Sequence, residues 1–270
     1  MMYLWLLLGL AILVVAGEFL VKGAVGLSIM MKITPLVIGM TVVSIGTSMP
    51  ELLVSVNSAV AGNPGIAIGN VVGSNIANIA FILGLAVLLL PIVADKQTKK
   101  VDYPMMLIAS VLFYVAAFDN MVERWEGIVL FVILVVFITR MIRKSRKSEK
   151  KRIAEITDED VASTDGLLPV WKSLTYLSIG LVGLYFGADW FVSGAVDIAK
   201  SFDLSDAIIG VTVVALGTSA PELVASLIAA YRKQSDLSVG NLIGSNVFNI
   251  LVFLYSPKTL KYSAIIFNND

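Results

Sequence analysis

The chain has 270 residues, of which 57% are hydrophobic and only 15% charged, and its basic and acidic residues balance to a net charge of zero. A soluble domain carries roughly one quarter charged residues, and a neutral chain offers no extended basic surface for nucleic acid. Cysteine and histidine are absent, which excludes disulfides, thiol chemistry, haem ligation and imidazole catalysis. A bound ion must therefore be held by oxygen atoms, which favour hard cations.

Long apolar runs of about 20 residues are the signature of transmembrane helices. The sequence contains eight such runs, so we predict an all-α polytopic membrane protein that lies in a lipid bilayer. The first run is too long for a signal peptide. In chain order the runs lie at about 3–29, 36–60, 66–92, 102–118, 125–142, 170–198, 207–230 and 238–255.

A charged segment at 143–168 follows the fifth run. It begins with a basic stretch, Arg143 to Arg152, and continues into an acidic stretch between Ile156 and Asp165. Lysine and arginine accumulate in short cytoplasmic loops. We therefore predict that 143–168 is a solvated cytoplasmic linker and that the N-terminus lies outside.

Two sequence motifs occur twice. The segment Gly39–Glu51 recurs as Gly210–Glu222, and Gly69–Asn78 recurs as Gly240–Asn249, both displaced by 171 residues. Five runs separate the start of one copy from the start of the next, and five is odd, so the second copy must cross the membrane in the opposite sense. This predicts an inverted-topology repeat of five helices, in which a site lies near the bilayer midplane between the copies.

The repeated carboxylates point to function rather than packing. Glu51 and Glu222 each lie about 15 residues into an apolar run, where a charge costs about 2.5–3.5 kcal/mol. Duplication kept for helix packing would explain the repeated glycines but not two buried acids. Interhelical hydrogen bonding is the alternative role for the serine, threonine and asparagine residues of the motifs.

A proline precedes each of these acids and is expected to break its helix. Pro50 and Pro221 lack an N–H group and clash with the carbonyl four residues earlier. We expect carbonyls near Ser44 and Gly46 in the first copy to leave the helical ladder and to become available to a cation. The second copy repeats the arrangement near Ala215 and Gly217.

Charge counting indicates which ions could share such a site. Two ionised carboxylates supply two negative charges, which one Ca²⁺ or two Na⁺ would neutralise. Loading both kinds of ion together would leave excess positive charge in a medium of low dielectric constant. The sequence thus predicts a site that holds either Ca²⁺ or Na⁺, as coupled exchange requires.

The doubled motif resembles a known family. Gly46-Thr-Ser-Met-Pro-Glu51 and Gly217-Thr-Ser-Ala-Pro-Glu222, each followed by Gly-Asn-x-x-Gly-Ser-Asn, are similar to the two α-repeats of the sodium/calcium exchanger family, within the cation/calcium antiporters. The resemblance covers about residues 3–250. It implies a secondary-active antiporter of the prokaryotic inner membrane, not an enzyme, that moves Ca²⁺ and Na⁺ by alternating access without a cofactor.

The same resemblance implies which residues bind the transported cations. The implied side-chain ligands are Thr47, Ser48, Glu51, Ser74, Asn78, Thr218, Ser219, Glu222, Ser245 and Asn249, joined by the backbone carbonyls of Ser44 and Ala215. Some members carry aspartate where this chain has Asn249, which leaves the ion ratio and any proton coupling open. Glu18 and Asp189 also match each other in the repeat, and we expect a structural or gating role for them.

The second half of the predicted repeat is shorter than the first. Residues 1–142 form a first half of five helices, 143–168 the cytoplasmic loop, 169–254 a truncated second half of three helices, and 255–270 a tail unlike anything in the first copy. About eight of the family's ten helices are therefore expected. A truncated or frameshifted product is the favoured explanation, with deliberate shortening or completion by another chain as alternatives, and transport by this polypeptide is in question.

Three other functions remain open at this point. A proton-coupled exchanger of Ca²⁺ or another cation would use the same carboxylates. An intramembrane hydrolase using the paired acids or Ser48 is disfavoured, because no histidine or lysine base lies near either motif serine. A channel or a non-transporting remnant is the third, and the oligomeric state is not predicted.

Overall fold

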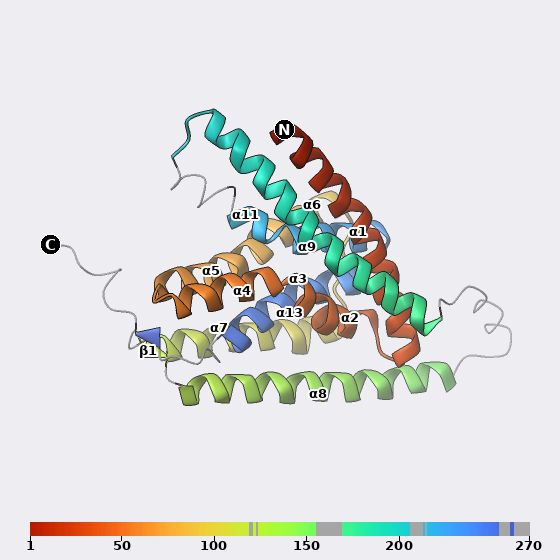
Figure 1. Cartoon of the computed structure of the whole chain (residues 1–270). Coiled ribbons are helices and arrows are strands. Elements are labelled where there is room, and N and C mark those ends of the chain that lie inside the picture. Colours follow the sequence, from red (N-terminus) through yellow and green to blue (C-terminus); the bar gives the residue numbers. More distant parts are fainter. Residues whose placement is uncertain are drawn as a thin grey trace.

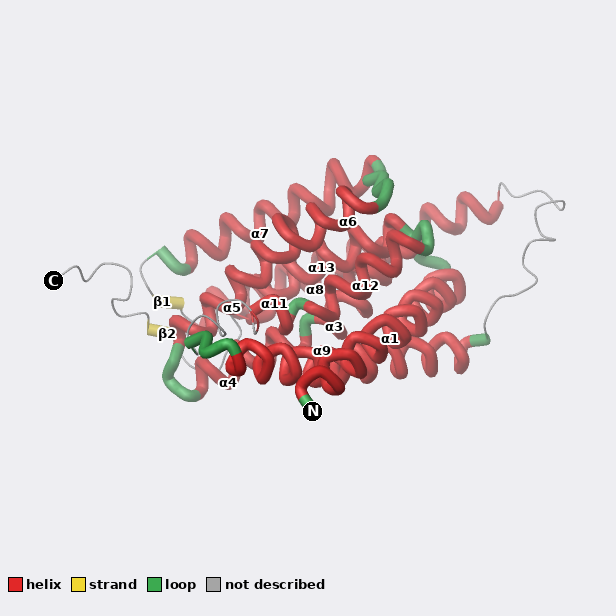
Figure 2. Tube along the Cα trace, turned by 90° about the horizontal axis from the view of Figure 1, so that it is seen from above, coloured by secondary structure: helices red, strands yellow, loops and turns green. Residues whose placement is uncertain are grey.

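The architecture is a bundle of helices, several of them broken (Figures 1 and 2). It is taken from a computed structural model, which describes residues 1–118, 121–122, 124–154, 169–205, 213, 215–253 and 260–261. The first half contains α1 (Met2–Met31), α2 (Pro35–Ile38), η1 (Gly39–Val43), α3 (Ser44–Thr47), α4 (Met49–Val60), α5 (Pro64–Ile76), η2 (Ala77–Leu83), α6 (Gly84–Leu89), η3 (Thr98–Asp102), α7 (Tyr103–Ala116) and α8 (Arg124–Ala154). The second half contains α9 (Val170–Ser201), α11 (Ala215–Thr218), α12 (Ala220–Tyr231) and α13 (Ser235–Phe253).

The prediction of an all-α fold is confirmed, with one small addition. Two strands of two residues each, β1 (Met121–Val122) and β2 (Leu260–Lys261), pair in antiparallel fashion. Within the described ranges, four helical segments are long and apolar enough to span a membrane, and the bent pair Pro35–Thr47 and Met49–Val60 makes a fifth if it counts as one span. The remaining spans of the predicted eight stay predictions, and most of the predicted tail lies outside the described residues.

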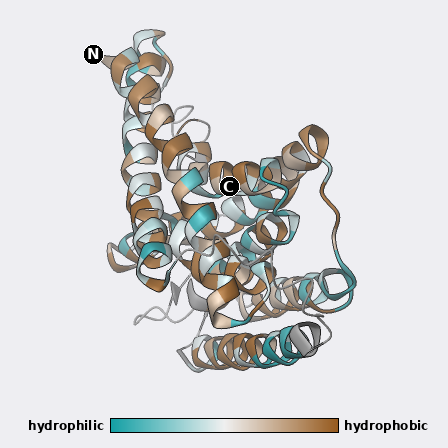
Figure 3. Cartoon of the chain, turned by 90° about the vertical axis from the view of Figure 1, so that its right-hand side faces the viewer, coloured by the Kyte–Doolittle hydropathy of each residue, from teal (hydrophilic) through white to brown (hydrophobic). Residues whose placement is uncertain are grey.

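Helix α8 extends further than its predicted apolar span. The basic residues from Arg143 onward continue the helix to Ala154 instead of opening a loop, because arginine, lysine and glutamate are good helix formers. Figure 3 shows the helix changing from a hydrophobic to a hydrophilic part. Ser145 is buried there, and its Oγ accepts a hydrogen bond from the backbone N–H of Thr34 at 2.8 Å. The rest of the predicted loop, 155–168, lies outside the described residues.

Helices α1 and α9, which begin the two copies, pack side by side and antiparallel (Figure 1). A Cβ atom on Gly180 would lie 2.5 Å from the backbone N of Leu20, and one on Gly194 would lie 2.5 Å from that of Leu6. The residue numbers of these contacts fall from 20 to 6 along α1 while they rise from 180 to 194 along α9, so the two helices run in opposite directions. This agrees with the predicted inversion of the second copy, and glycine permits the close approach.

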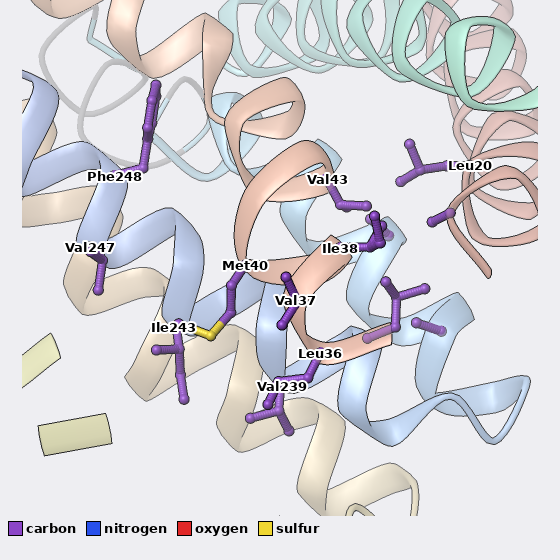
Figure 4. Packing of buried hydrophobic residues seen from close by; sticks show 14 of the residues in the cluster. Leu20, Leu36, Val37, Ile38, Met40, Val43, Val239, Ile243, Val247 and Phe248 are labelled. Carbon is purple, nitrogen blue, oxygen red and sulfur yellow. The ribbon is translucent and has the colours of Figure 1, made fainter. Parts of the chain in front are cut away.

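Helix α13 lies at the centre of the bundle, where it contacts α2, η1, α3, α7, α8 and α12. A Cβ atom on Gly240 would lie 2.5 Å from the carbonyl oxygen of Leu36, so the two backbones nearly touch. Figure 4 shows the apolar side chains along this contact, with Leu36 near Val239 and Met40 near Ile243. This close packing fixes the first motif segment against the helix that carries the second motif of the other copy.

Candidate functional site

The site is built on two helices that break at equivalent positions. Ser48 has φ −85° and ψ 6°, which ends α3 and starts α4 with a bend of 48°. Ser219 repeats this conformation with φ −89° and ψ 7° between α11 and α12. Glu51 and Glu222 therefore lie in the first turns of α4 and α12, where the positive end of the helix dipole favours a negative charge.

Each motif serine donates a hydrogen bond to the carboxylate of the opposite copy. Ser48 Oγ donates to Glu222 Oε1 at 2.8 Å, and Ser219 Oγ donates to Glu51 Oε1 at 3.3 Å. Glu51 is 2% exposed and Glu222 is 1% exposed. The structure thus brings together four of the predicted ligands, from both copies, in one buried cluster.

Several oxygen atoms of the predicted ligands are buried and make no hydrogen bond. They are Glu51 Oε2, Glu222 Oε2, Asn78 Oδ1 and Ser245 Oγ. The Ser245 hydroxyl does face the Glu222 carboxylate, as does that of Thr47, but Ser245 Oγ makes no hydrogen bond of good geometry there. The two carboxylates also lie close enough to repel each other. Buried, unpartnered oxygens with two negative charges fit a hard cation, which accepts six to eight oxygen ligands when it is Ca²⁺.

Two of the predicted ligands are already engaged with their own helices. The Ser44 carbonyl accepts the N–H of Ser48 at 3.0 Å, and the Thr47 hydroxyl lies 3.4 Å from this carbonyl and 3.2 Å from Asn241 Oδ1. The expectation that this carbonyl leaves the helical ladder is therefore wrong, because the break falls at Ser48, after the 44–48 hydrogen bond has formed. Ser74 Oγ donates to the carbonyl of Asn70 at 2.7 Å. Cation binding by both residues stays a prediction.

The second copy supplies the remaining predicted ligands. Thr218 ends α11, which begins at Ala215. Ser245 and Asn249 lie on α13 and are buried. The Nδ2 atom of Asn249 donates to Asn75 Oδ1 at 3.3 Å, as the Nδ2 atom of Asn78 donates to Asn246 Oδ1 at 2.9 Å. The amides of Asn78 and Asn249 are thus both held by asparagines of the opposite copy.

Sequence reasoning missed a set of asparagines that support the site. Asn70 Nδ2 donates to the carbonyl of Glu51 at 2.9 Å and to Ser55 Oγ at 2.7 Å. Its counterpart Asn241 donates to Ser226 Oγ at 3.0 Å. Each asparagine stands directly after the first glycine of the second motif, and Ser55 and Ser226 are separated by the same 171 residues as the motifs. That common displacement is the signal that could have identified them.

Glu18 and Asp189 do not join the buried cluster. Arg232 Nε donates to both carboxylate oxygens of Glu18 at 3.0 Å, and its Nη2 lies 2.8 Å from Glu18 Oε1. This ion pair ties α1 to the end of α12. Asp189, the repeat counterpart of Glu18, is exposed on α9. The predicted structural role fits Glu18, and gating by either residue stays a prediction.

Comparison with known proteins gives the same family as the motifs. The family model described as sodium/calcium exchanger protein matches residues 1–143 and 172–261. The sodium/calcium exchanger MaX1 of Methanosarcina acetivorans is 33% identical over 283 residues, covering 93% of this chain and 81% of that protein. The inner membrane protein YrbG of Escherichia coli is 36% identical over 257 residues, covering 94% of this chain and 78% of that protein.

A solved structure extends the likeness to the fold. The sodium-calcium exchanger NCX_Mj, soaked with 2.5 mM Na⁺ and 0.1 mM Ca²⁺, superposes with a TM-score of 0.80 at 32% identity, over 97% of this chain and 84% of that one. These matches confirm the predicted family. They also confirm the prediction that the chain is an integral membrane transporter rather than an enzyme. The chain belongs to the sodium/calcium exchanger family of cation antiporters.

Proposed function

We propose that the chain exchanges Ca²⁺ for Na⁺ across the membrane, by alternating access to the buried site around Glu51 and Glu222. The observation that carries the proposal is the pair of crossed hydrogen bonds from Ser48 to Glu222 and from Ser219 to Glu51. These contacts join the two copies at one cluster, and sites between inverted repeats are where secondary transporters bind their substrates.

Electrostatics supports competition between the two ions. The carboxylates repel each other and are nearly inaccessible to solvent. Two like charges 4 Å apart repel by about 4 kcal/mol at an effective dielectric constant of 20. One Ca²⁺ or two Na⁺ relieve that repulsion, whereas both together would replace it with an excess of positive charge. The proposed ligands are the twelve residues implied by the family motif.

The names of the relatives point the same way. MaX1 and NCX_Mj are both called sodium/calcium exchangers. A proton-coupled exchanger is the second candidate, because two adjacent buried carboxylates that repel each other are also relieved by taking up a proton.

Transport assays in proteoliposomes separate these two functions. An outward Na⁺ gradient should drive uptake of radioactive Ca²⁺ by the wild-type chain, and Glu51→Gln or Glu222→Gln should abolish it by removing one of the two charges. Asp203→Asn is the matched control. Asp203 is exposed and has a φ of 56°, which asparagine also tolerates, so uptake should be unchanged. Uptake driven by a pH gradient and not by a Na⁺ gradient would overturn Na⁺ coupling.

A further inference from the structure

Two asparagines bridge the copies beside the carboxylate cluster. Asn75 Nδ2 donates to the backbone carbonyl of Asn246 at 3.4 Å, and Asn246 Nδ2 donates to the backbone carbonyl of Asn75 at 3.2 Å. The two residues are 171 positions apart, so they are repeat counterparts. This reciprocal pair fastens α5 to α13 through the side-chain nitrogen atoms and leaves both side-chain oxygen atoms available.

Each available oxygen accepts the amide of a predicted ligand from the opposite copy. Asn246 Oδ1 accepts Asn78 Nδ2 at 2.9 Å, and Asn75 Oδ1 accepts Asn249 Nδ2 at 3.3 Å. The pattern is crossed in the same way as the serine–carboxylate bonds, because in each bond the donor and the acceptor belong to different copies.

The direction of these bonds matters for cation binding. An asparagine amide has an oxygen at one end and an NH₂ group at the other, and only the oxygen can bind a cation. Holding the NH₂ group of Asn78 on Asn246 turns the Asn78 oxygen away from that contact, and this oxygen is buried without a hydrogen-bond partner. An amide rotated by half a turn would present N–H groups to the ion instead.

The surroundings strengthen the bridge. A groove of about 500 Å³ borders both asparagines, and its other lining residues are mainly apolar, including Val72, Ile76 and Phe113. Hydrogen bonds are electrostatically stronger in such a medium, and an unsatisfied polar group there is costly. An unpaired amide at either position would therefore be costly.

We propose that Asn75 and Asn246 are crossed positioning residues, each of which fixes the cation-binding orientation of an amide in the opposite copy. Asn246 acts through Asn78, and Asn75 acts through Asn249. The inference rests on the proposed function, since it needs a cation at the cluster. Removing a group that orients a metal ligand typically costs about 10- to 100-fold in affinity, so Asn246→Ala should weaken Ca²⁺ binding by that factor.

Double-mutant cycles on the purified chain test the crossed pattern, with equilibrium binding of radioactive Ca²⁺ as the measurement. The alanine variants suit the test because the two hydrogen bonds between Asn75 and Asn246 are accepted by backbone carbonyls. Asn246→Ala therefore leaves the acceptor of the Asn75 side chain in place. In an Asn78→Ala background, Asn246→Ala should change affinity by no more than about twofold, whereas in an Asn249→Ala background it should keep its full effect. Asn75→Ala should show the mirror pattern, and Asn57→Ala, on an exposed position of α4, should have no effect.

The outcomes separate this inference from the proposed function. Wild-type protein that binds no Ca²⁺ would overturn both. Wild-type binding with equal effects of Asn246→Ala in the two backgrounds would overturn only the positioning role, because a purely structural contact does not distinguish them. Asn246→Asp keeps an oxygen facing Asn78 and serves as a second variant if the alanine protein does not fold. A loss of binding in Asn246→Asp that persists undiminished in the Asn78→Ala background would also refute the crossed pattern.

Discussion

Replacing Ser48 by alanine should weaken Ca²⁺ binding more than replacing Ser219, although the two serines are repeat counterparts. The bond from Ser48 Oγ to Glu222 Oε1 is 2.8 Å long, within the usual range for O–H···O bonds, whereas the bond from Ser219 Oγ to Glu51 Oε1 is 3.3 Å long and outside it. A hydrogen bond to a charged group contributes about 1.5–3 kcal/mol, which corresponds to roughly 10- to 100-fold in an equilibrium constant. The bond holds the Glu222 carboxylate in position for the ion, so Ser48→Ala should weaken binding by up to that factor, and about threefold or less is expected for Ser219→Ala.

Equilibrium Ca²⁺ binding to the purified variants measures this asymmetry directly. Ser58→Ala, a half-buried position further along α4, controls for the effect of a serine-to-alanine change on that helix. Thermal unfolding in the absence of Ca²⁺ separates a local loss of affinity from a general loss of stability. Equal losses in Ser48→Ala and Ser219→Ala, or a larger loss in Ser219→Ala, would refute the assignment of the shorter bond as the stronger one.

Two further predictions concern stability. Gly244→Ala should lower the unfolding temperature, because the new Cβ atom would lie 2.5 Å from Met40 Cα and overpacking typically costs about 1–3 kcal/mol. Gly84→Ala, whose Cβ would meet nothing within 4 Å, should leave the unfolding temperature within about 2 °C, and a matching fall in both variants would contradict the steric argument. Asp102→Asn should raise the unfolding temperature at neutral pH, because both carboxylate oxygens of Asp102 are buried without a hydrogen-bond partner and a buried charge is costlier than a neutral amide. A lower unfolding temperature for Asp102→Asn would show that the attraction between Asp102 and Lys144 outweighs this cost.

The doubled motif was enough to predict the architecture around the site. Its constant displacement and the odd number of intervening runs predicted that the copies are inverted, and the antiparallel packing of α1 on α9 agrees. The helix breaks before Glu51 and Glu222 followed from the prolines. These features are predictable because proline and membrane crossing impose local rules that hold whatever the helices pack against.

The contacts between the copies could not be predicted in this way. Ser74 lies in the α-helix α5, whereas Asn78 lies in the π-helical segment η2, which begins at Ala77. The wider turn of a π-helix changes the angular spacing between residues, so Ser74 bonds to its own helix while Asn78 reaches Asn246. No rule of sequence spacing specifies which residue meets which across an interface between two copies.

The crossed arrangement has a consequence for alternating access. If each copy completed its own half of the site, the halves could move apart while each kept its local geometry. Here the Glu222 carboxylate depends on a serine of the first copy, and the Asn78 amide depends on an asparagine of the second. A shift of one copy against the other would therefore move predicted ligands of both copies at once. Under the proposed function, such mutual dependence would couple the conformation of the repeat to the bound ion, as exchange at a single shared site requires.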